Sequence, residues 1–486
     1  MKILHAISEL YPLIKTGGLA DVGYALPHAQ HREGVDVHVL LPAYGEILKT
    51  IKQFQVIGRC HVQGVNRVHH VRILEIQPTG FDIPVWLADC PELFDRPGNP
   101  YLNEDGFDWE DNAERFSCFS QTACQIALGN AEIDWIPEVV HAHDWQTGLI
   151  PAFLSQKMQA PYCLFTIHNL AYGGQFSHED FMSLHLPAQW WHHDKIEFYG
   201  GFSMLKAGIV YSNHVTTVSP NYAREILTST FSCGMEGVLS HHQNKLSGIL
   251  NGIDTETWNP ETDPWLKAVY DIKNRNSGKA INKKALLKKM GCKNPASHSH
   301  VPLFASIGRL VEQKGIDLLM TAIPKLLKQH DAIFVIVGEG QQIYHKKLEQ
   351  LQQHFPNQLF LYLGYSEELA HQVEAAADFF VMPSRFEPCG LNQLYSLRYG
   401  TLPIVHSVGG LSDTVVDATE ENIKQKTATG LVFHHPTSDA VFNVLERGIT
   451  LYLQQKTYTQ IQANAMQQDF GWQKSARQYL SLYQEL

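Results

Sequence analysis

The apolar positions of the first forty residues predict a strand, a helix and a second strand. A short apolar run lies at residues 3–7. Between residues 19 and 29 apolar side chains recur at steps of three and four, which is the spacing of one helix face. Apolar side chains then occupy every second position from 35 to 41, as in a strand. The pattern predicts a βαβ unit.

The same alternation of strand-like and helix-like segments continues along the chain. It predicts a mostly parallel, doubly wound sheet, and the pattern restarts near residue 303 as a second α/β domain. We expect further strands at 139–141, 162–167, 214–218 and 246–250, and in the second set at 303–307, 333–337, 359–363, 379–382 and 403–406.

The length of 486 residues suggests about two to four domains, and two fit the pattern most simply. Residues 259–300 are polar and rich in lysine, which predicts a surface excursion just past the domain junction. Open α/β sheets bind ligands at the carboxyl ends of their strands. Two such domains in tandem therefore predict a ligand cleft between them.

Charge and composition exclude several classes of protein. A formal net charge of -11 provides no basic surface for nucleic acid, and no polybasic cluster indicates a membrane partner. No apolar run reaches the roughly 18 residues that span a bilayer, and the first residues are typical of a strand rather than a signal peptide. The 8 cysteines are scattered. We expect a cytoplasmic protein with mostly buried thiols.

The stretch KTGGLAD at residues 15–21 lies between the first strand and the first helix. Two glycines allow a ligand to approach the backbone, the helix start offers unpaired N–H groups, and Lys15 adds a positive charge. These features predict a phosphate site, whereas the simpler alternative is a tight turn. The spacing matches neither a dinucleotide-binding fingerprint nor a P-loop.

In the second domain, Arg309 and Lys314 follow the strand predicted to end at Ile307. A guanidinium and an ammonium group together suit a diphosphate whose charge grows as it leaves. The alternative is a pair of solvated surface cations. Their place after a strand's carboxyl end favours the first interpretation.

Residues 383–391 follow the next strand of that domain. Pro388 is well placed to begin a helix, with Glu387 just before it, so we expect an ionised carboxylate that accepts hydrogen bonds from sugar hydroxyls. The N–H groups near Cys389 to Leu391 would meet the donor. The alternative for Glu387 is an ordinary helix cap.

Two strand ends in the first domain carry histidines. In HAHDW at 141–145 a metal site is conceivable, but no third ligand lies at a convincing spacing, and Asp144 is better interpreted as an acceptor for a hydroxyl group. His168 could act as an acid or base, donate a hydrogen bond to a sugar, or be a satisfied structural histidine. Its motif does not separate these alternatives.

Nine stretches, in order, resemble the bacterial and plant glycogen and starch synthases that use a nucleotide-diphospho-glucose donor. The resemblance covers nearly the whole chain. The stretches are KTGGLADV at 15–22, DRPGNPY at 95–101, HAHDW at 141–145, FTIHNLAY at 165–172, GMEG at 234–237, LNGID at 250–254, RLVEQKG at 309–315, SRFEPCGLNQLY at 384–395 and GGLSDTV at 409–415.

The resemblance implies a GT-B fold, with two Rossmann-like doubly wound α/β domains and an interdomain cleft. Residues 1–250 and a return helix at 466–486 would form the first domain, and residues 251–465 the nucleotide-sugar-binding domain. The implied reaction moves glucose from ADP-glucose to the non-reducing 4-hydroxyl of an α-1,4-glucan, elongating glycogen. It retains configuration and needs no cofactor and no metal, and the leaving diphosphate helps to deprotonate the acceptor hydroxyl.

The resemblance also assigns roles to residues. Lys15 and the N–H of Gly18 would contact the donor phosphates, while Tyr365 would stack on adenine. The implied catalytic residues are Lys15, His168, Arg309, Lys314 and Glu387, and the implied binding residues are Lys15, Gly18, Asp21, Tyr101, Asp144, Asn169, Asn251, Tyr365, Cys389, Gly390 and Leu391.

Four positions depart from the family pattern. Tyr24 enters the first helix near the donor loop, and Asn392, His406 and Val408 replace residues that are commonly threonine, arginine and threonine. Two rival functions stay open. A glucan phosphorylase would need a pyridoxal-bearing lysine and a much longer chain, and a catalytically inactive glucan-binding protein would not need three convergent cations.

Overall fold

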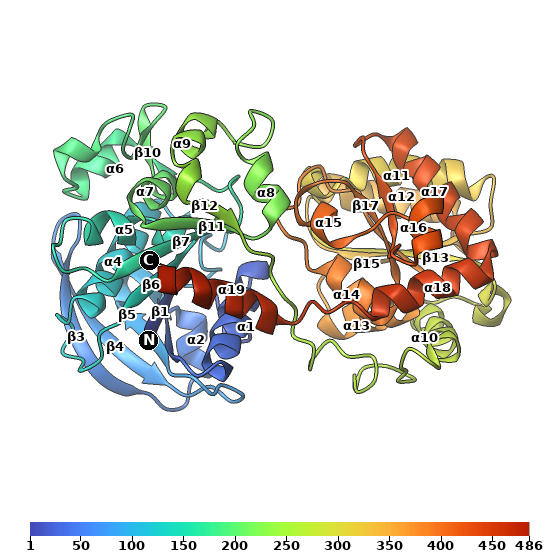
Figure 1. Ribbon diagram of the computed structural model, residues 1–486, viewed down its shortest axis with the longest axis horizontal. Helices are drawn as coiled ribbons and strands as arrows, with labels where there is room; N and C mark the ends of the chain where they lie inside the picture. Colours follow the sequence, from blue (N-terminus) through green and yellow to red (C-terminus); the bar gives the residue numbers. More distant parts are fainter. Residues whose placement is uncertain (486) are drawn as a thin grey trace. The chain divides into compact units, whose positions relative to one another are not determined.

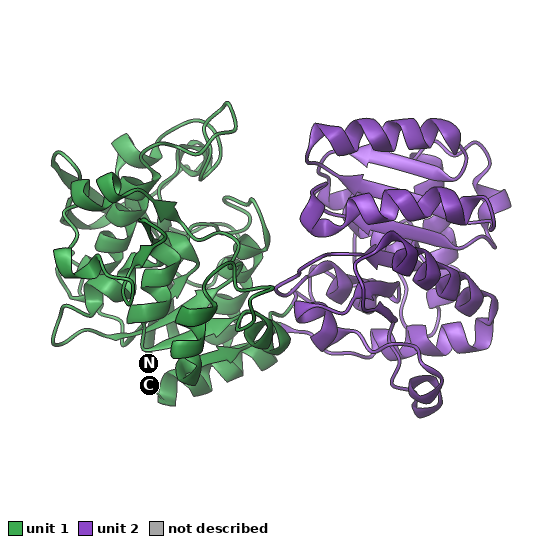
Figure 2. Cartoon of the chain, turned by 90° about the horizontal axis from the view of Figure 1, so that it is seen from above, with its two compact units in different colours: residues 1–252, 472–486 green, residues 253–471 purple. Residues whose placement is uncertain are grey.

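The computed structural model describes residues 1–485, and the chain divides into two compact units (Figure 2). The first unit comprises residues 1–252 and the chain from Trp472 onward, and the second comprises residues 253–471. The return to the first unit therefore begins later than the expected residue 466. Helix α18 (Gln455–Met466) and the turn after it stay with the second unit.

The first unit contains a nine-stranded sheet in the order β12-β11-β7-β6-β1-β2-β5-β4-β3. Neighbouring strands from β12 to β5 are parallel, whereas β5, β4 and β3 pair antiparallel. The strands are β1 (Lys2–Ala6), β2 (Asp36–Pro42), β3 (Gln55–Gln63), β4 (Val68–Ile76), β5 (Val85–Asp89), β6 (Val139–His143), β7 (Tyr162–Ile167), β11 (His214–Thr217) and β12 (Leu246–Gly248).

A small antiparallel sheet, ten α-helices and three short 3-10 helices complete the described part of this unit. The small sheet contains β8 (Gln175–Phe176), β9 (Glu197–Phe198) and β10 (Gly201–Ser203). The helices are α1 (Gly18–Arg32), α2 (Gly45–Thr50), α3 (Pro91–Phe94), α4 (Asn112–Ala127), α5 (Leu149–Leu154), α6 (His178–Ser183), α7 (Met204–Tyr211), α8 (Pro220–Glu225), α9 (Glu236–His241) and α19 (Trp472–Glu485).

The last helix, α19, packs beside α1 at the opposite end of the sequence (Figure 1). Its buried Trp472, Tyr479 and Tyr483 share one apolar cluster with Ile3 of β1 and Leu26 of α1. Burying aromatic side chains of this size removes a large apolar area from water. The C-terminal segment is thus part of the first unit's core.

The second unit contains a six-stranded parallel sheet in the order β15-β14-β13-β16-β17-β18. Its strands are β13 (Leu303–Ile307), β14 (Ile333–Gly338), β15 (Leu359–Leu363), β16 (Phe379–Met382), β17 (Leu402–His406) and β18 (Leu431–Phe433). Besides α18, its helices are α10 (Arg275–Lys289), α11 (Ile316–Leu327), α12 (Gln342–His354), α13 (Glu367–Ala376), α14 (Asn392–Tyr399), α15 (Gly409–Thr414), α16 (Glu420–Gln425) and α17 (Ser438–Leu453).

The segment 259–300 is more than the surface excursion that its composition predicted. It contains α10, and Lys279 and Lys283 of that helix are buried. The Nζ atom of Lys283 lies 2.7 Å from Oδ2 of Asp378, while the Lys279 ammonium donates to main-chain carbonyls and to Thr401. The lysines hold the helix against the unit instead of pointing into solvent.

The parallel strands bring the predicted motifs to two sheet edges. In the first unit, the segments after β1, β6, β7 and β12 leave from the carboxyl edge of one sheet. In the second unit, those after β13, β15, β16 and β17 do the same. No helix among the described residues is long and apolar enough to cross a membrane. The cysteines are free thiols, and six of them are buried.

Candidate active site

The loop between β1 and α1 is organised by a residue that the sequence motifs did not single out, Glu9. Its carboxylate accepts hydrogen bonds from the Thr16 N–H at 2.6 Å, the Thr16 hydroxyl at 2.5 Å and the Gly17 N–H at 3.1 Å. Glu9 is 3% exposed. Hydrogen bonds to a carboxylate are stronger than neutral ones, so this buried group fixes the loop that carries Lys15.

Lys15 lies beside the first turn of α1. Its Nζ atom is 2.8 Å from Oδ1 of Asp21 and lies over the Tyr11 ring at 5.3 Å from the centroid. Gly17 is the N-cap of the helix and supplies no side-chain cap, so Gly18 begins the helix with N–H groups that have no intrahelical partner. The predicted Lys15, Gly18 and Asp21 are brought together, and the arrangement suits an anion.

Tyr101 joins this loop from the 95–101 stretch. Its hydroxyl group lies 2.7 Å from Oε1 of Glu9 and 2.8 Å from the Ser8 hydroxyl. Burial and the neighbouring Glu9 carboxylate raise the pKa of Tyr101, which stays a phenol. The hydroxyl therefore donates to Glu9 and braces the same carboxylate that holds the loop.

Asp144 follows β6 in a strained conformation, with φ of 62°. Its carboxyl group is buried, and Oδ1 has no hydrogen-bond partner among the described residues. Burial raises the pKa of Asp144 to about 8, although the main-chain N–H groups of His168, Asn169 and Trp145 lower it. Backbone strain and an unpaired buried oxygen are features that cluster at functional sites.

His168 and Asn169 follow β7 and lie next to Asp144 through those main-chain N–H groups. The Nε2 atom of His168 is 3.0 Å from Nδ1 of His143. Burial lowers the pKa of His168 to about 3, so the ring is neutral. Oδ1 of Asn169 accepts the Ala171 N–H at 3.1 Å, and Oδ1 of the buried Asn251, after β12, is unpaired within residues 1–485.

The structure adds a third histidine to the pair considered as a metal site. Ligand atoms of His5, His141 and His143 lie within 4.8 Å of one another. His141, however, contacts the Tyr483 and Thr166 hydroxyls through its two ring nitrogens, at 2.7 and 2.6 Å. These nitrogens are engaged by protein groups, so the cluster is satisfied without an ion. Two further groups of possible ligands lie among residues 1–485: His69, Cys90 and Glu92, and His192, His193 and Asp194.

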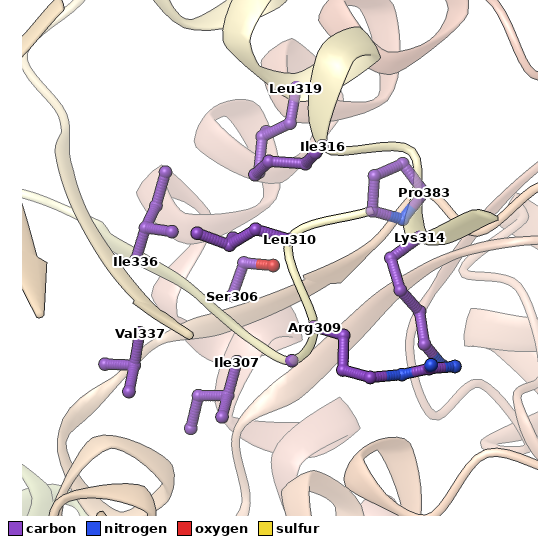
Figure 3. A pocket seen from close by; sticks show the side chains of 11 residues that line it. Ser306, Ile307, Arg309, Leu310, Lys314, Ile316, Leu319, Ile336, Val337 and Pro383 are labelled. Carbon is purple, nitrogen blue, oxygen red and sulfur yellow. The ribbon is translucent and has the colours of Figure 1, made fainter. Parts of the chain in front are cut away.

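In the second unit, Arg309 and Lys314 extend from the segment between β13 and α11, where a small hollow lies (Figure 3). The Nζ atom of Lys314 is 2.6 Å from Oε2 of Glu387, which also accepts the Ser384 hydroxyl at 3.0 Å. Residues lining the hollow include Ser306, Ile307, Gly308, Arg309, Lys314 and Pro383.

The prediction that Pro388 begins a helix is wrong. Helix α14 begins at Asn392, and Gly390 has φ of 74°, which no helix residue adopts. The Glu387 carboxylate, 6% exposed, is therefore held by Lys314 and Ser384, and its position before α14 does not make it a helix cap. Cys389, Gly390 and Leu391 form the turn that leads into α14.

Two close backbone contacts fix the loop around Glu387. A side chain at Gly409 would approach the Glu387 carbonyl oxygen to 1.9 Å, and one at Gly315 would approach that of Pro383 to 2.0 Å. Arg385 adds a paired contact with Asp317, its two terminal nitrogens lying 2.8 and 2.7 Å from the carboxylate oxygens. The GGL and EQKG motifs thus serve as the surfaces against which this loop packs.

The four departures from the family pattern are accommodated locally. The Asn392 amide donates to the Ile307 carbonyl at 2.8 Å, and His406 Nδ1 lies 2.8 Å from the Ser384 carbonyl. Val408 is buried before α15. Tyr24 packs on His28 and Phe81, with ring centroids 4.4 and 5.1 Å apart, so it joins an aromatic cluster on the side of α1.

Tyr365 follows β15, on the same sheet edge as Arg309 but two strands away. Its side chain is 67% exposed, and its hydroxyl bonds to Glu367. Motif reading missed Glu9, Ser384 and His143 as partners of the predicted residues. Of these three, only Glu9 could have been found from the sequence. It is an acidic residue just after a buried strand, and a carboxylate in that position needs hydrogen-bond partners.

Comparisons with known proteins cover the whole chain. Residues 2–241 match the family described as starch synthase catalytic domain, and residues 293–468 match glycosyl transferases group 1. Glycogen synthase of Hydrogenovibrio crunogenus is 48% identical, with 100% of each chain covered. Glycogen synthase 2 of Nitrosococcus oceani is 47% identical over 100% of this chain and 97% of the relative.

Among solved structures, the catalytic domain of starch synthase IV from Arabidopsis thaliana, bound to ADP and acarbose, matches with a TM-score of 0.87. It is 32% identical and covers 100% of this chain and 99% of its own. A sucrose-phosphate synthase from Thermosynechococcus elongatus shares the fold at a TM-score of 0.60 and 16% identity. These likenesses confirm the expected GT-B fold class.

Proposed function

Because this chain belongs to the glycogen and starch synthase family, we propose that it transfers glucose from ADP-glucose to the non-reducing 4-hydroxyl of an α-1,4-glucan. The family transfers glucose to glucan; the donor base, the retained configuration and the residue roles are the proposed part. The relative bound to ADP and acarbose supports an adenine nucleotide and a glucan as ligands.

The observation that carries the proposal is the group of Arg309, Lys314 and Glu387 at the carboxyl edge of the second sheet. Two cations and a buried carboxylate lie on neighbouring segments, with Lys314 Nζ 2.6 Å from Glu387 Oε2. Cations placed where charge develops on a leaving diphosphate stabilise the transition state more than the ground state. We assign Arg309 and Lys314 to that diphosphate.

Glu387 is proposed to hold glucose hydroxyls. Its Oε2 atom is occupied by Lys314 and Ser384, while Oε1 makes no hydrogen bond with the rest of the described chain. The second oxygen is therefore left for a ligand hydroxyl group. In the same way the Asp144 Oδ1 and Asn251 Oδ1 atoms, buried and unpaired, are proposed to bind sugar hydroxyls together with His168 and Asn169.

The loop after β1 is proposed to bind the donor phosphates. Lys15 would exchange Asp21 for a phosphate oxygen, and the N–H of Gly18 would donate to it. Glu9 and Tyr101 keep the loop in place. Cys389, Gly390 and Leu391 would supply main-chain N–H donors from the second unit, and the exposed Tyr365 ring would stack on adenine.

In the proposed reaction, the bond between glucose C1 and the diphosphate oxygen breaks as the acceptor 4-hydroxyl oxygen bonds to C1 on the same face. The acceptor proton passes to the departing phosphate oxygen. Because the acceptor oxygen bonds to C1 on the face that the diphosphate leaves, configuration is retained without a covalent bond between glucose and a residue of this chain. We propose that the reaction takes place in the cytoplasm.

The donor assignment is tested by initial rates of transfer to glycogen with ADP-glucose and UDP-glucose at equal concentration. Faster turnover of ADP-glucose supports the proposal, and faster turnover of UDP-glucose overturns it. A glucan phosphorylase would instead release glucose 1-phosphate from glycogen and phosphate and show pyridoxal absorbance. A glucan-binding protein without activity would transfer nothing from either donor.

A further inference from the structure

A continuous chain of buried polar side chains runs behind His168. It starts at Gln30 on α1, whose amide faces two ways: Oε1 lies 2.7 Å from His5 Nε2, and Nε2 donates to the Tyr483 hydroxyl at 3.1 Å. His5 Nδ1 lies 3.0 Å from His143 Nε2, and His143 Nδ1 lies 3.0 Å from His168 Nε2. Four elements, α1, β1, β6 and the end of β7, contribute to this branch.

The chain is shielded from water. Gln30 and His5 are fully buried, and His143 is 1% exposed. Burial lowers the pKa of His5 to about 4 and the pKa of His143 well below its ordinary value. Both rings are therefore neutral, and a neutral imidazole has one N–H donor and one bare acceptor nitrogen. In such a chain each hydrogen bond decides the direction of the next.

Gln30 sets that direction. Its carbonyl oxygen accepts only, so His5 must carry its proton on Nε2 and present Nδ1 as an acceptor. His143 must then donate from Nε2 to His5, which leaves its Nδ1 bare. His168 must in turn donate from Nε2 to that nitrogen. With the Gln30 amide oriented as it is here, any other assignment leaves two donors or two lone pairs facing each other in the core.

The second branch of the chain agrees with this direction. The Gln30 amide nitrogen donates to the Tyr483 hydroxyl, which is then free to donate to His141 Nδ1 at 2.7 Å. His141 carries its proton on Nε2, which faces the Thr166 hydroxyl at 2.6 Å. Both branches are paired at every step, so the C-terminal helix α19 helps to fix the amide that directs the histidines.

We propose that this chain locks His168 as the Nε2–H tautomer and leaves Nδ1 as a hydrogen-bond acceptor for the ligand. Nδ1 has no hydrogen-bond partner within residues 1–485, and the ring is partly exposed. His168 then accepts a hydrogen bond from a sugar hydroxyl and does not act as a proton donor. This inference rests on the proposed place of His168 in the sugar site. His143, His5 and Gln30 are positioning residues.

The direct test is ¹⁵N NMR of the ¹⁵N-histidine-labelled, deuterated full-length protein, without substrate. The His168 signals are identified by their loss in His168→Asn. The proposal predicts a pyrrole-type Nε2 and a pyridine-type Nδ1 for His168. A pyrrole-type Nδ1, or a protonated ring at neutral pH, overturns it. Zinc added to the same sample must leave the His168 signals unchanged. Zinc binding by His5, His141 or His143 would require their lone pairs, so a zinc-induced change at His168 would also overturn the proposal.

Two variants at His143 separate positioning from packing. Asn places an amide oxygen near the position of Nδ1 and can accept from His168, whereas Phe fills the space without an acceptor. We expect His143→Asn to keep the tautomer and a kcat/KM within a few-fold of the wild type. His143→Phe should lose about tenfold, the factor for one misdirected hydrogen bond. His38→Phe, at a buried histidine outside the chain, is the control.

Equal kcat/KM values for the Asn and Phe variants, with both folded, would contradict a positioning role. The NMR measurement needs no substrate. The only variant that must fold for it is His168→Asn, which assigns the signals. If the wild type transfers no glucose, the proposed function fails while the tautomer assignment stands. If it transfers glucose with a pyrrole-type Nδ1 on His168, the function stands and this inference fails.

Discussion

The Glu387 carboxylate accepts from the Lys314 ammonium, with Oε2 and Nζ 2.6 Å apart, although the two residues follow different strands of the second sheet. Ser384 holds the same oxygen. The pair places a positive charge directly beside a hydrogen-bond acceptor, the combination that the proposed diphosphate-linked sugar requires. The account of this site therefore depends on these two residues more than on any others.

Removing the carboxylate should abolish most transfer. Glu387→Ala is expected to lower kcat by at least about a hundredfold, because it removes the proposed sugar contact and releases Lys314. The initial rate with saturating ADP-glucose and glycogen measures this. Glu368→Ala, which breaks the exposed pair with Lys289, is the matched control and should keep the wild-type rate. A kcat near that of the wild type for Glu387→Ala would remove Glu387 from the mechanism.

The Lys15 charge should matter mainly for the donor. Lys15→Gln is expected to raise the KM for ADP-glucose and to lower kcat/KM by about ten- to a hundredfold, since a phosphate contact is lost. The KM for glycogen should change little. Lys157→Gln, at an exposed lysine of the same unit, is the control. If Lys15→Gln leaves donor kinetics unchanged, the loop is only a turn.

Glu9 should act on both stability and donor use. Glu9→Gln replaces a carboxylate that accepts from Thr16, Gly17 and Tyr101, and an amide nitrogen cannot accept. We expect a loss of about 1–3 kcal/mol in the free energy of unfolding and a higher KM for ADP-glucose. Urea unfolding and donor titration measure the two effects. An unchanged free energy of unfolding and an unchanged KM would show that the loop keeps its conformation without the Glu9 carboxylate.

Asp144 should lower stability as the pH rises. Its pKa is raised to about 8 in the folded protein by burial, so the folded state holds a proton that the unfolded state loses above its ordinary value of 3.8. The free energy of unfolding therefore falls between about pH 4 and pH 8 through this group. Asp144→Asn should remove that fall and be more stable at pH 7, while transfer activity drops. A variant less stable than the wild type at pH 7 would contradict this.

His69 should also make stability fall as the pH rises, but through a stabilising contact that is lost. Burial lowers its pKa, but the hydrogen bonds from its ring to Glu114 and Glu92, each at 2.9 Å, outweigh burial and raise the pKa overall. Its contribution to stability is complete below the unfolded pKa of 6.5 and is lost as the pH rises through the folded pKa. His69→Gln should thus cost more stability at pH 6 than at pH 9. An equal loss of unfolding free energy at both pH values would show that the contacts of His69 with Glu92 and Glu114 do not stabilise the folded protein through the charge of the ring.

Much of the fold followed from the apolar pattern. Runs such as 162–167 and 333–337 are fully apolar or nearly so because parallel strands are buried on both faces, and they were found. The antiparallel β3 and β4 were not, because their exposed positions carry polar residues such as Arg59 and Arg72, which conceals a strand in a composition-based reading. The start of α14 was misplaced because Gly390 bends the chain after Pro388.

The sequence motifs were sufficient to predict individual residues of the candidate site, but not the contacts between them. Lys15, Asp144 and Glu387 could be selected, since charged residues at strand ends rarely serve the core. Their partners could not, because the contacts of Glu9 with Tyr101 and of His143 with His168 join residues far apart in the sequence. Tyr24 lies near the β1–α1 loop, as its sequence position suggested, because its ring meets that of Tyr11 at 6.2 Å, and it also packs on Phe81.

The central claim is tested most directly by incubating the wild-type protein with ADP-[¹⁴C]glucose and glycogen and digesting the labelled polymer with an exo-acting α-1,4-glucan hydrolase. The account predicts label incorporated into glycogen and released completely by the enzyme, because glucose is added in α-1,4 linkage at non-reducing ends. No incorporation, or label in the polymer that resists this digestion, would contradict it.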